Sequence, residues 1–425
     1  MTIKNEKLLN GVSFLKIPDE KNRFKTNRLS LSFIVPLNIE TVSANAILPH
    51  ILRRSCKDYP DFTALNQKLC DLYGARLFAS VSNLGDNQIL TLGISAIDDS
   101  FALNGEQVSR GCADLLCSLL FNPRIENESF CSEDFEAEKR QLIEQIQSEI
   151  IDKRSYAKNR LREQMCAGEP FAIGKLGTKE TADALTNEAV VKAFNNIKKT
   201  AQIQIIMTGN QEEQPIIDAF LEGLKGLNRT ESALTSIISK KPKTVRDFEE
   251  ELDVNQAKLV MGFHTGIAEP DEAVFGARVM TALLGGTPHS RLFLNVRERL
   301  SLCYYCAAAF DKSKGIITVD SGLDEHNVPL AKEEIMNQLD FCKRGDFTND
   351  ELKSTKLSLQ NSYRAICDNQ GALEAYYLGQ IFDKKIITPL EAVQKIEQVT
   401  RQQVTDCANN VTLDSVYLLK GRAEQ

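Results

Sequence analysis

Apolar and polar residues alternate along several short segments of the chain, a two-residue period that is typical of β-strands. In the first half the alternation covers residues 28–38, 88–97 and 201–210. In the second half it covers residues 257–267, 302–310 and 314–324. All six segments are predicted to be strands.

Apolar residues between the strands of the first half recur with the period of an amphipathic helix. Residues 62–72 follow Asp61, which can cap a helix, and precede Gly74, which can end one. A longer helical pattern covers residues 134–165 and places four apolar residues near one face, namely Phe135, Leu142, Ile146 and Ile150. The fold class predicted from these elements is α+β.

The second half repeats the order of the first. The helical segment 348–369 is similar to 132–153, and this similarity aligns Lys139 with Lys356. Near the ends of the halves, Gly209 aligns with Gly421, and the spacing of this pair differs from that of the lysines by only a few positions. Such similar spacings indicate an internal duplication. We therefore predict two homologous domains, 1–228 and 246–425, joined by a polar, turn-rich linker over 229–245.

Composition narrows the class of protein. A net charge of −7 and a pI near 5.5 argue against a nucleic-acid partner, which normally requires a basic face. No apolar run has the length of a membrane span, and the polar start of the chain lacks the apolar core of a signal peptide. The eleven cysteines form no recognisable framework. We expect a cytoplasmic protein with reduced thiols.

One Cys-x-x-Cys pair, Cys303 and Cys306, occurs in "LCYYCAAAF". A metal site would require a second cysteine pair or a nearby histidine, and neither is present at suitable spacing. The strand-like alternation predicts that the two thiols point to opposite faces. Packing is therefore favoured over metal or redox chemistry.

The segment "LPHILRRSC" carries the most informative chemistry. Replacing Arg53 by Glu and Arg54 by His would create His-x-x-Glu-His, in which two histidines share one helix face and can bind one zinc ion. The four histidines are His50, His264, His289 and His326, and even the closest two, His264 and His289, are several helical turns apart. The chain thus has no pair of histidines at the spacing of such a motif.

Three segments resemble the insulinase/pitrilysin peptidase family, which includes the mitochondrial processing peptidases: "PHILRRS", "FEAEKRQLIEQI" and "LLGGTPHSRLFLNVRERLSLCYY". The third is the most specific. The resemblance covers nearly the whole chain. It implies two homologous α+β domains, each with a mixed sheet packed by helices, facing each other across a central chamber.

Active members of that family hold one zinc ion with two histidines and a distant glutamate, and the glutamate of the motif acts as general base. The resemblance places His50 at the first ligand position and Arg54 at the second, where a guanidinium has no lone pair for a metal. Arg53 stands at the position of the base and cannot accept a proton near neutral pH. Glu138 matches the first glutamate of the second signature, and the third ligand position, seven residues later, is Gln145, a poor zinc ligand. No metal is expected on this chain.

Arg297 and Tyr304 match an arginine and a tyrosine that family members use to grip the substrate backbone and stabilise charge on the scissile carbonyl. A guanidinium and a phenol are both suitable donors to such a developing oxyanion. The alternative is that Arg297 is one member of a charged helix face, together with Glu298 and Arg299.

The resemblance implies a catalytically inactive subunit that pairs with a zinc-bearing homologue and contributes Arg297 and Tyr304 to peptide hydrolysis on the partner. A homodimer is the other assembly expected. Peptide or unfolded polypeptide would bind partly by strand addition, for which 88–97 and 315–323 are the suspected strands. Two alternatives remain open: a stand-alone zinc peptidase with an unorthodox site, and a non-proteolytic scaffold or binding protein.

Overall fold

The computed structural model describes residues 3–241, 244–383 and 385–422. It divides into two compact units, and neither is continuous in sequence. The first unit comprises the chain up to Gln147, then Ile173–Thr235 and Asp368–Gly379. The second comprises Ser148–Ala172, Ser236–Cys367 and the chain from Gln380 onward.

The first unit contains a six-stranded sheet in the order β1-β2-β8-β3-β5-β4. Its strands are β1 (Lys4–Leu9), β2 (Val12–Ile17), β3 (Thr26–Pro36), β4 (Arg76–Leu84), β5 (Asn87–Ile97) and β8 (Gln202–Thr208). Its helices are α1 (Val42–Leu52), α2 (Phe62–Asp71), α3 (Val108–Phe121), α4 (Ser132–Ser148), α6 (Lys179–Asp183), α7 (Asn187–Thr200), α8 (Gln214–Leu224) and α12 (Gln370–Leu378). A small hairpin of β6 (Ile125–Glu126) and β7 (Ser129–Phe130) precedes α4.

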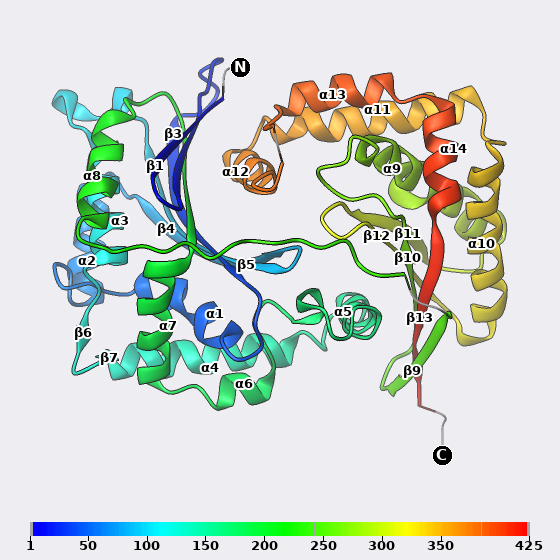
Figure 1. Ribbon diagram of the computed structural model, residues 1–425, viewed down its shortest axis with the longest axis horizontal. Coiled ribbons are helices and arrows are strands. Elements are labelled where there is room, and N and C mark those ends of the chain that lie inside the picture. The colour runs from blue at the N-terminus through cyan, green and yellow to red at the C-terminus, as the bar shows by residue number, and fades with distance from the viewer. Residues whose placement is uncertain (1–2, 242–243, 384, 423–425) are drawn as a thin grey trace. The chain divides into compact units, whose positions relative to one another are not determined.

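The core of the first unit lies between this sheet and helices α1, α3, α7 and α8 (Figure 1). Alternate residues of β3, from Leu29 to Val35, enter the core because side chains alternate across a strand. The residues between them include Ser30 and Ser32, which are buried on the opposite face. Helix α2 begins where Asp61 accepts a hydrogen bond from the backbone N–H of Ala64, so the predicted cap is confirmed.

The second unit contains a five-stranded sheet in the order β11-β12-β10-β13-β9. Its strands are β9 (Arg246–Leu252), β10 (Ala257–His264), β11 (Tyr305–Asp311), β12 (Ile316–Leu323) and β13 (Thr412–Gly421). Its helices are α5 (Lys153–Met165), α9 (Val274–Thr281), α10 (Val328–Arg344), α11 (Asn349–Ile366), α13 (Pro389–Gln398) and α14 (Arg401–Asn410), with π-helical segments η4 (Ala282–Gly286) and η5 (Phe293–Arg299).

The two sheets share one topology. In each, a central strand (β3 or β10) pairs antiparallel with two neighbours, β8 and β5 in the first unit and β13 and β12 in the second. The strand beyond β8 or β13, namely β2 or β9, pairs with it in parallel. Sharing both strand order and strand direction confirms the predicted duplication and the α+β class. All six predicted strands are present, with ends close to those expected.

Each unit incorporates one helix from the other half of the sequence. Helix α5 precedes the linker but packs on β10 and β13, where Ala157 and Leu161 contact Val260 and Leu419. Helix α12 lies in the second half of the sequence, yet it belongs to the first unit and contacts β8. This explains why the units differ from the contiguous ranges 1–228 and 246–425, because a boundary drawn in sequence cannot separate interchanged helices.

The helical pattern predicted over residues 134–165 is two helices rather than one. Helix α4 ends at Ser148, and Asp152 starts α5 by accepting hydrogen bonds from the backbone N–H groups of Arg154 and Ser155. Ile150 lies in the break, is 38% exposed and does not join the predicted face. Residues 227–241, which include the first part of the predicted linker, have no regular secondary structure. No helix of the described ranges is both long and apolar enough to cross a membrane.

We expect the ion pair between Arg28 of β3 and Glu374 of α12 to hold α12 in the first unit. Glu374 is 5% exposed, and the Arg28 guanidinium also lies 3.5 Å from the ring centroid of Phe78. Glu374→Gln should lower the free energy of unfolding by about 2 kcal/mol, because the half-buried Arg28 loses its charged partner. Urea unfolding measures this. The control is Asp368→Asn, whose ion pair with Arg23 is exposed and should contribute little. Equal effects of the two substitutions would contradict the prediction.

Candidate functional site

The degenerate motif lies at the end of helix α1, which continues through Pro49 and ends at Leu52. His50 lies in its last turn, and Arg54 follows the helix. The Arg54 side chain reaches helix α4, where its Nε lies 2.6 Å from Glu138 Oε1 and its Nη1 lies 3.2 Å from Asp134 Oδ1. The structure therefore brings Arg54 and Glu138 together, in an ion pair that joins α1 to α4.

Burial makes this ion pair structurally important. Glu138 is 3% exposed, and an isolated carboxylate at such a position would be strongly destabilised. The hydrogen bond to Glu138 is the main reason that the pKa of Arg54 is raised above its ordinary value. Burial, followed by the positive charge of Arg53, lowers the pKa of His50, so its imidazole is neutral at neutral pH. The residue at the second ligand position implied by the resemblance therefore carries a positive charge and is held by two carboxylates.

The residues at this position do not fit zinc. A guanidinium has no lone pair for the metal, and Gln145, on α4 two turns beyond Glu138, offers only a neutral amide. Among residues 3–241, 244–383 and 385–422, no group of three or more His, Cys, Asp or Glu side chains is arranged to hold a metal. No step of zinc chemistry can be assigned to this motif.

Arg297 and Tyr304 lie on the second unit, and both are accessible. Arg297, in η5, is 41% exposed at its side chain, with its guanidinium 4.7 Å from the ring centroid of Phe293 and 3.6 Å from the Glu298 carboxylate. Tyr304 is 55% exposed and its phenol is 3.4 Å from Asp324, a weak hydrogen bond. Its backbone N–H donates to the carbonyl of Gly322, which anchors the residue to the sheet. Both donor groups can therefore reach a ligand.

The Cys303 and Cys306 thiols lie close together, so the prediction that they point to opposite faces is wrong. Strand β11 begins only at Tyr305, and Cys303 precedes it without the alternation of a strand. A hydrogen bond from Cys306, opposed by burial and assisted by Ser321 and the charge of Arg297, lowers the pKa of Cys303 to about 7. The positive charge of Arg297 therefore acts on the residue next to Tyr304.

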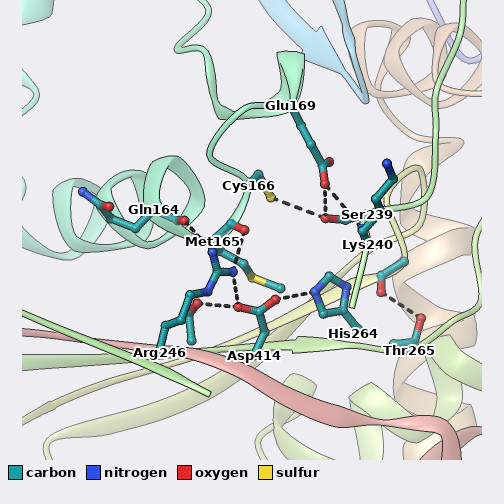
Figure 2. A network of polar contacts seen from close by, with 12 residues as sticks. Gln164, Met165, Cys166, Glu169, Ser239, Lys240, Arg246, His264, Thr265 and Asp414 are labelled. Carbon is teal, nitrogen blue, oxygen red and sulfur yellow. Dashed lines mark hydrogen bonds and ion pairs between the residues drawn. The ribbon is translucent and has the colours of Figure 1, made fainter. Parts of the chain in front are cut away.

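A buried polar network that the sequence did not reveal lies in the second unit (Figure 2). His264, at the end of β10, and Asp414, on β13, share a hydrogen bond of 2.5 Å and are 3% and 0% exposed. Arg246 of β9 binds the same carboxylate and donates to the carbonyl groups of Gln164 and Met165 at the end of α5. An imidazole–carboxylate pair resembles catalytic machinery, but burial closes this one to substrate, so its role is structural.

The segment that follows α5 is held by further contacts of this network. Ser239 Oγ donates to Glu169 Oε1 at 2.9 Å and lies 3.8 Å from the Cys166 thiol. The Lys314 ammonium lies 3.1 Å from the other oxygen of Glu169. Asp414 is far from His264 in sequence, so the sequence could not have predicted their contact. The only available signal was the alternation of apolar and polar residues along β10, which ends at His264.

Comparison with known proteins agrees with this geometry. A family model described as "Peptidase M16 inactive domain" matches residues 184–359. Over 399 residues, 94% of each chain, the sequence is 28% identical to "Probable inactive metalloprotease YmfF" of Bacillus subtilis (strain 168). Both matches show that the chain resembles the M16, or insulinase-type, peptidase family, and its sequence lacks the zinc motif of active members. The resemblance noted in the sequence is thereby confirmed.

Solved structures share the fold of this chain over its full length. A conserved protein from Enterococcus faecalis V583 has a TM-score of 0.91 and 27% sequence identity, with complete coverage of both chains. A peptidase M16 inactive domain from Pseudomonas fluorescens has a TM-score of 0.78 at 15% identity, covering 100% of this chain and 99% of the other. That second likeness establishes only the fold.

Restoring the motif should create a zinc site in this chain. The triple variant Arg53→Glu, Arg54→His, Gln145→Glu should bind about one zinc ion per chain, since it supplies two imidazoles and a carboxylate. Elemental analysis after dialysis against zinc measures this, with circular dichroism to confirm folding. Adding His50→Ala should abolish binding. One tight equivalent in the unmodified chain would overturn the conclusion that its motif cannot hold zinc.

Asp414 should stabilise the second unit in a pH-dependent manner. Burial alone would raise its pKa, but hydrogen bonds from His264, Ser415 and Arg246 outweigh burial and lower the pKa below the ordinary value of 3.8. The stabilisation is therefore complete well above pH 3.8 and is lost as the pH falls through the lowered pKa. Asp414→Asn should reduce the free energy of unfolding at pH 7 by about 3 kcal/mol.

Urea unfolding of the wild type and the Asn variant between pH 7 and pH 3 measures this contribution. The difference between them should shrink at the acidic end. Glu249→Gln is the matched control, because its pair with Lys420 at the same sheet is exposed and should contribute little. A difference that grows as the pH falls would contradict the assignment.

Proposed function

We propose that this chain is the non-zinc subunit of a two-chain assembly, paired with a zinc-bearing homologue, and that the assembly binds and cleaves peptides. One observation carries the proposal: the side chains of Arg297 and Tyr304, which the resemblance assigns to substrate binding, are exposed, whereas Arg54, at the second ligand position that the resemblance implies, is tied up by Glu138. A chain that had lost all peptidase function would have no need to keep both donors accessible.

Arg297 and Tyr304 have the chemistry to assist a metal site on another chain. The hydrolysis of a peptide bond places negative charge on the carbonyl oxygen, and positioned donors lower the energy of that transition state. Neither side chain has a strong partner that would compete, since the Arg297 contact with Glu298 is 3.6 Å and the Tyr304 contact with Asp324 is 3.4 Å. In the proposed assembly the partner supplies the metal and the base, and this chain supplies the donors.

A peptide could bind by adding a strand at a sheet edge. The strands suspected from sequence, 88–97 and 315–323, do not provide an edge, because β5 and β12 are each paired on both sides. Among the described strands of the two large sheets, the edges are β1 and β4 in the first unit and β11 and β9 in the second. We favour β11, which begins directly after Tyr304, so that a peptide added there would lie beside the phenol.

No disulfide joins any of the eleven cysteines, all of which lie in the described ranges, and a reducing compartment favours this state. We therefore propose that the assembly works in the cytoplasm. This location is compatible with peptide or unfolded polypeptide as the substrate.

Mixing this chain with a His-x-x-Glu-His homologue from the same cells tests the proposal. Light scattering after size-exclusion chromatography should detect a heterodimer, and only the mixture should cleave a fluorogenic peptide library. Arg297→Ala and Tyr304→Phe should each lower kcat by about 100-fold without preventing assembly. Arg299→Ala is the control, because Arg299 is exposed on the same element and pairs with Glu334.

The other outcomes separate the alternatives. Zinc-dependent cleavage by this chain alone would establish a stand-alone peptidase. A complex without cleavage, or a homodimer that ignores the homologue, would favour a scaffold. If Arg299→Ala lowers activity as much as Arg297→Ala does, the general surface charge of this chain, and not the arginine–tyrosine pair, assists cleavage.

A further inference from the structure

A pocket of about 690 Å³ in the first unit lies away from every residue discussed as a functional site. It opens where the chain leaves β5 and β8 and enters β3, so one end of the sheet forms its floor. We name it the amide pocket after two of its lining residues, Asn27 and Gln211.

The floor of the amide pocket holds buried polar atoms that lack partners. Asn27 is 8% exposed, and neither Oδ1 nor Nδ2 has a hydrogen-bond partner among the described residues. Gln211 is 7% exposed; its Nε2 donates to Asp98 Oδ2 at 2.6 Å, which fixes the orientation of the amide. Its Oε1 consequently remains an acceptor without a donor in the described part of the chain.

The two amide oxygens converge. A Cβ built on Gly209 would lie 2.2 Å from Asn27 Oδ1 and 2.5 Å from Gln211 Oε1, so both oxygens crowd the same point beside the glycine backbone. Two adjacent carbonyl-type oxygens repel each other unless a donor lies between them. A group with several N–H donors, such as an ammonium, satisfies both at once.

Charge selects a cation. The pocket is lined by one guanidinium, Arg110, and by five carboxylates: Asp19, Asp98, Asp99, Glu106 and Glu212. Arg110 is already engaged by Asp114 and by the carbonyl of Pro215. Three of the carboxylates accept hydrogen bonds only from neutral groups in these contacts, namely Asp98, Asp99 and Glu106. Hydroxyl, amide and backbone N–H donors do not neutralise their negative charge.

Two nearby features also favour an organic cation. Asp99 already accepts from the backbone N–H of Ser109 in the first turn of α3, so this helix end is not open to an anion. The pocket wall includes Phe24 and Phe101, the latter 53% exposed, which can cover an alkyl chain or the face of a cation. A bare metal ion is disfavoured, because no metal-holding group of side chains occurs among the described residues.

We propose that the amide pocket binds a small organic cation that carries an amine and, a short alkyl chain away, a hydrogen-bond acceptor. The ammonium lies between the oxygens of Asn27 and Gln211. The acceptor group of the ligand can accept a hydrogen bond from an amide N–H that has no other partner, or from an N–H group at the rim of the pocket. The carboxylates supply the favourable potential. The proposal is independent of the peptide chemistry at Arg297 and Tyr304, so either can fail alone.

The probe is 6-aminohexanamide, which has both groups, measured by saturation-transfer NMR on the full chain. Hexanamide lacks the charge and hexylamine lacks the acceptor, and each should bind about tenfold more weakly. Equal binding of all three compounds, or no saturable binding of the probe, would overturn the proposal.

Asn27→Leu provides the decisive variant. Because the Asn27 amide has no partner within the described chain, its loss should leave the melting temperature of the free protein unchanged or higher, while probe binding disappears. Asn45→Leu is the matched control: Asn45 is 4% exposed, donates to Gln88 and lies outside the pocket, so this variant should melt earlier and still bind the probe. Unchanged binding by Asn27→Leu would refute the site.

Glu212→Gln is a second variant that keeps the test valid if Asn27→Leu does not fold. Glu212 is exposed on the rim of the pocket. Removing its charge should weaken the binding of the probe by about threefold without affecting the binding of the uncharged hexanamide. An equal change for both compounds would show that the pocket does not select for positive charge.

Discussion

The buried carboxylate of Glu138 constrains everything around the degenerate motif. It is almost inaccessible to water, and a charge in that position requires a cation nearby. Arg54 provides that cation, and its guanidinium also pairs with Asp134. The contact between α1 and α4 therefore persists without a metal. A guanidinium can pair with a buried carboxylate, but it cannot supply the chemistry of a zinc ion.

The second unit carries two exposed hydrogen-bond donors. Arg297 and Tyr304 remain accessible, and the field of Arg297 also acts on Cys303. The same unit also contains a buried polar network in which Asp414 links β13 to β10 and, through Arg246, to the end of α5. A closed network of this kind makes that part of the unit rigid.

Duplication explains the architecture. Two sheets with the same strand order and direction descend from one pattern, yet the equivalent helices α5 and α12 are incorporated into opposite units. Helix α5 buries Val260 and Leu419, on the face of the β10–β13 sheet opposite the main core. Each sheet is thus completed by a helix from the other half, and neither half of the sequence would have a complete unit alone.

The sequence by itself determined the class of fold, the six strands, the duplication and the failure of the zinc motif, because each depends on residue type and on spacing along the chain. An arginine cannot bind a metal wherever it is placed. Only the tertiary structure decided which residues far apart in sequence come together. It pairs Arg54 with Glu138 and His264 with Asp414, and it brings Asn27 close to Gln211. It also decided that β5 and β12 are interior strands and that the Cys303 and Cys306 thiols meet. Local periodicity indicates on which face of a helix or strand a residue lies. Contacts between segments far apart along the chain depend instead on how the sheets and helices pack together.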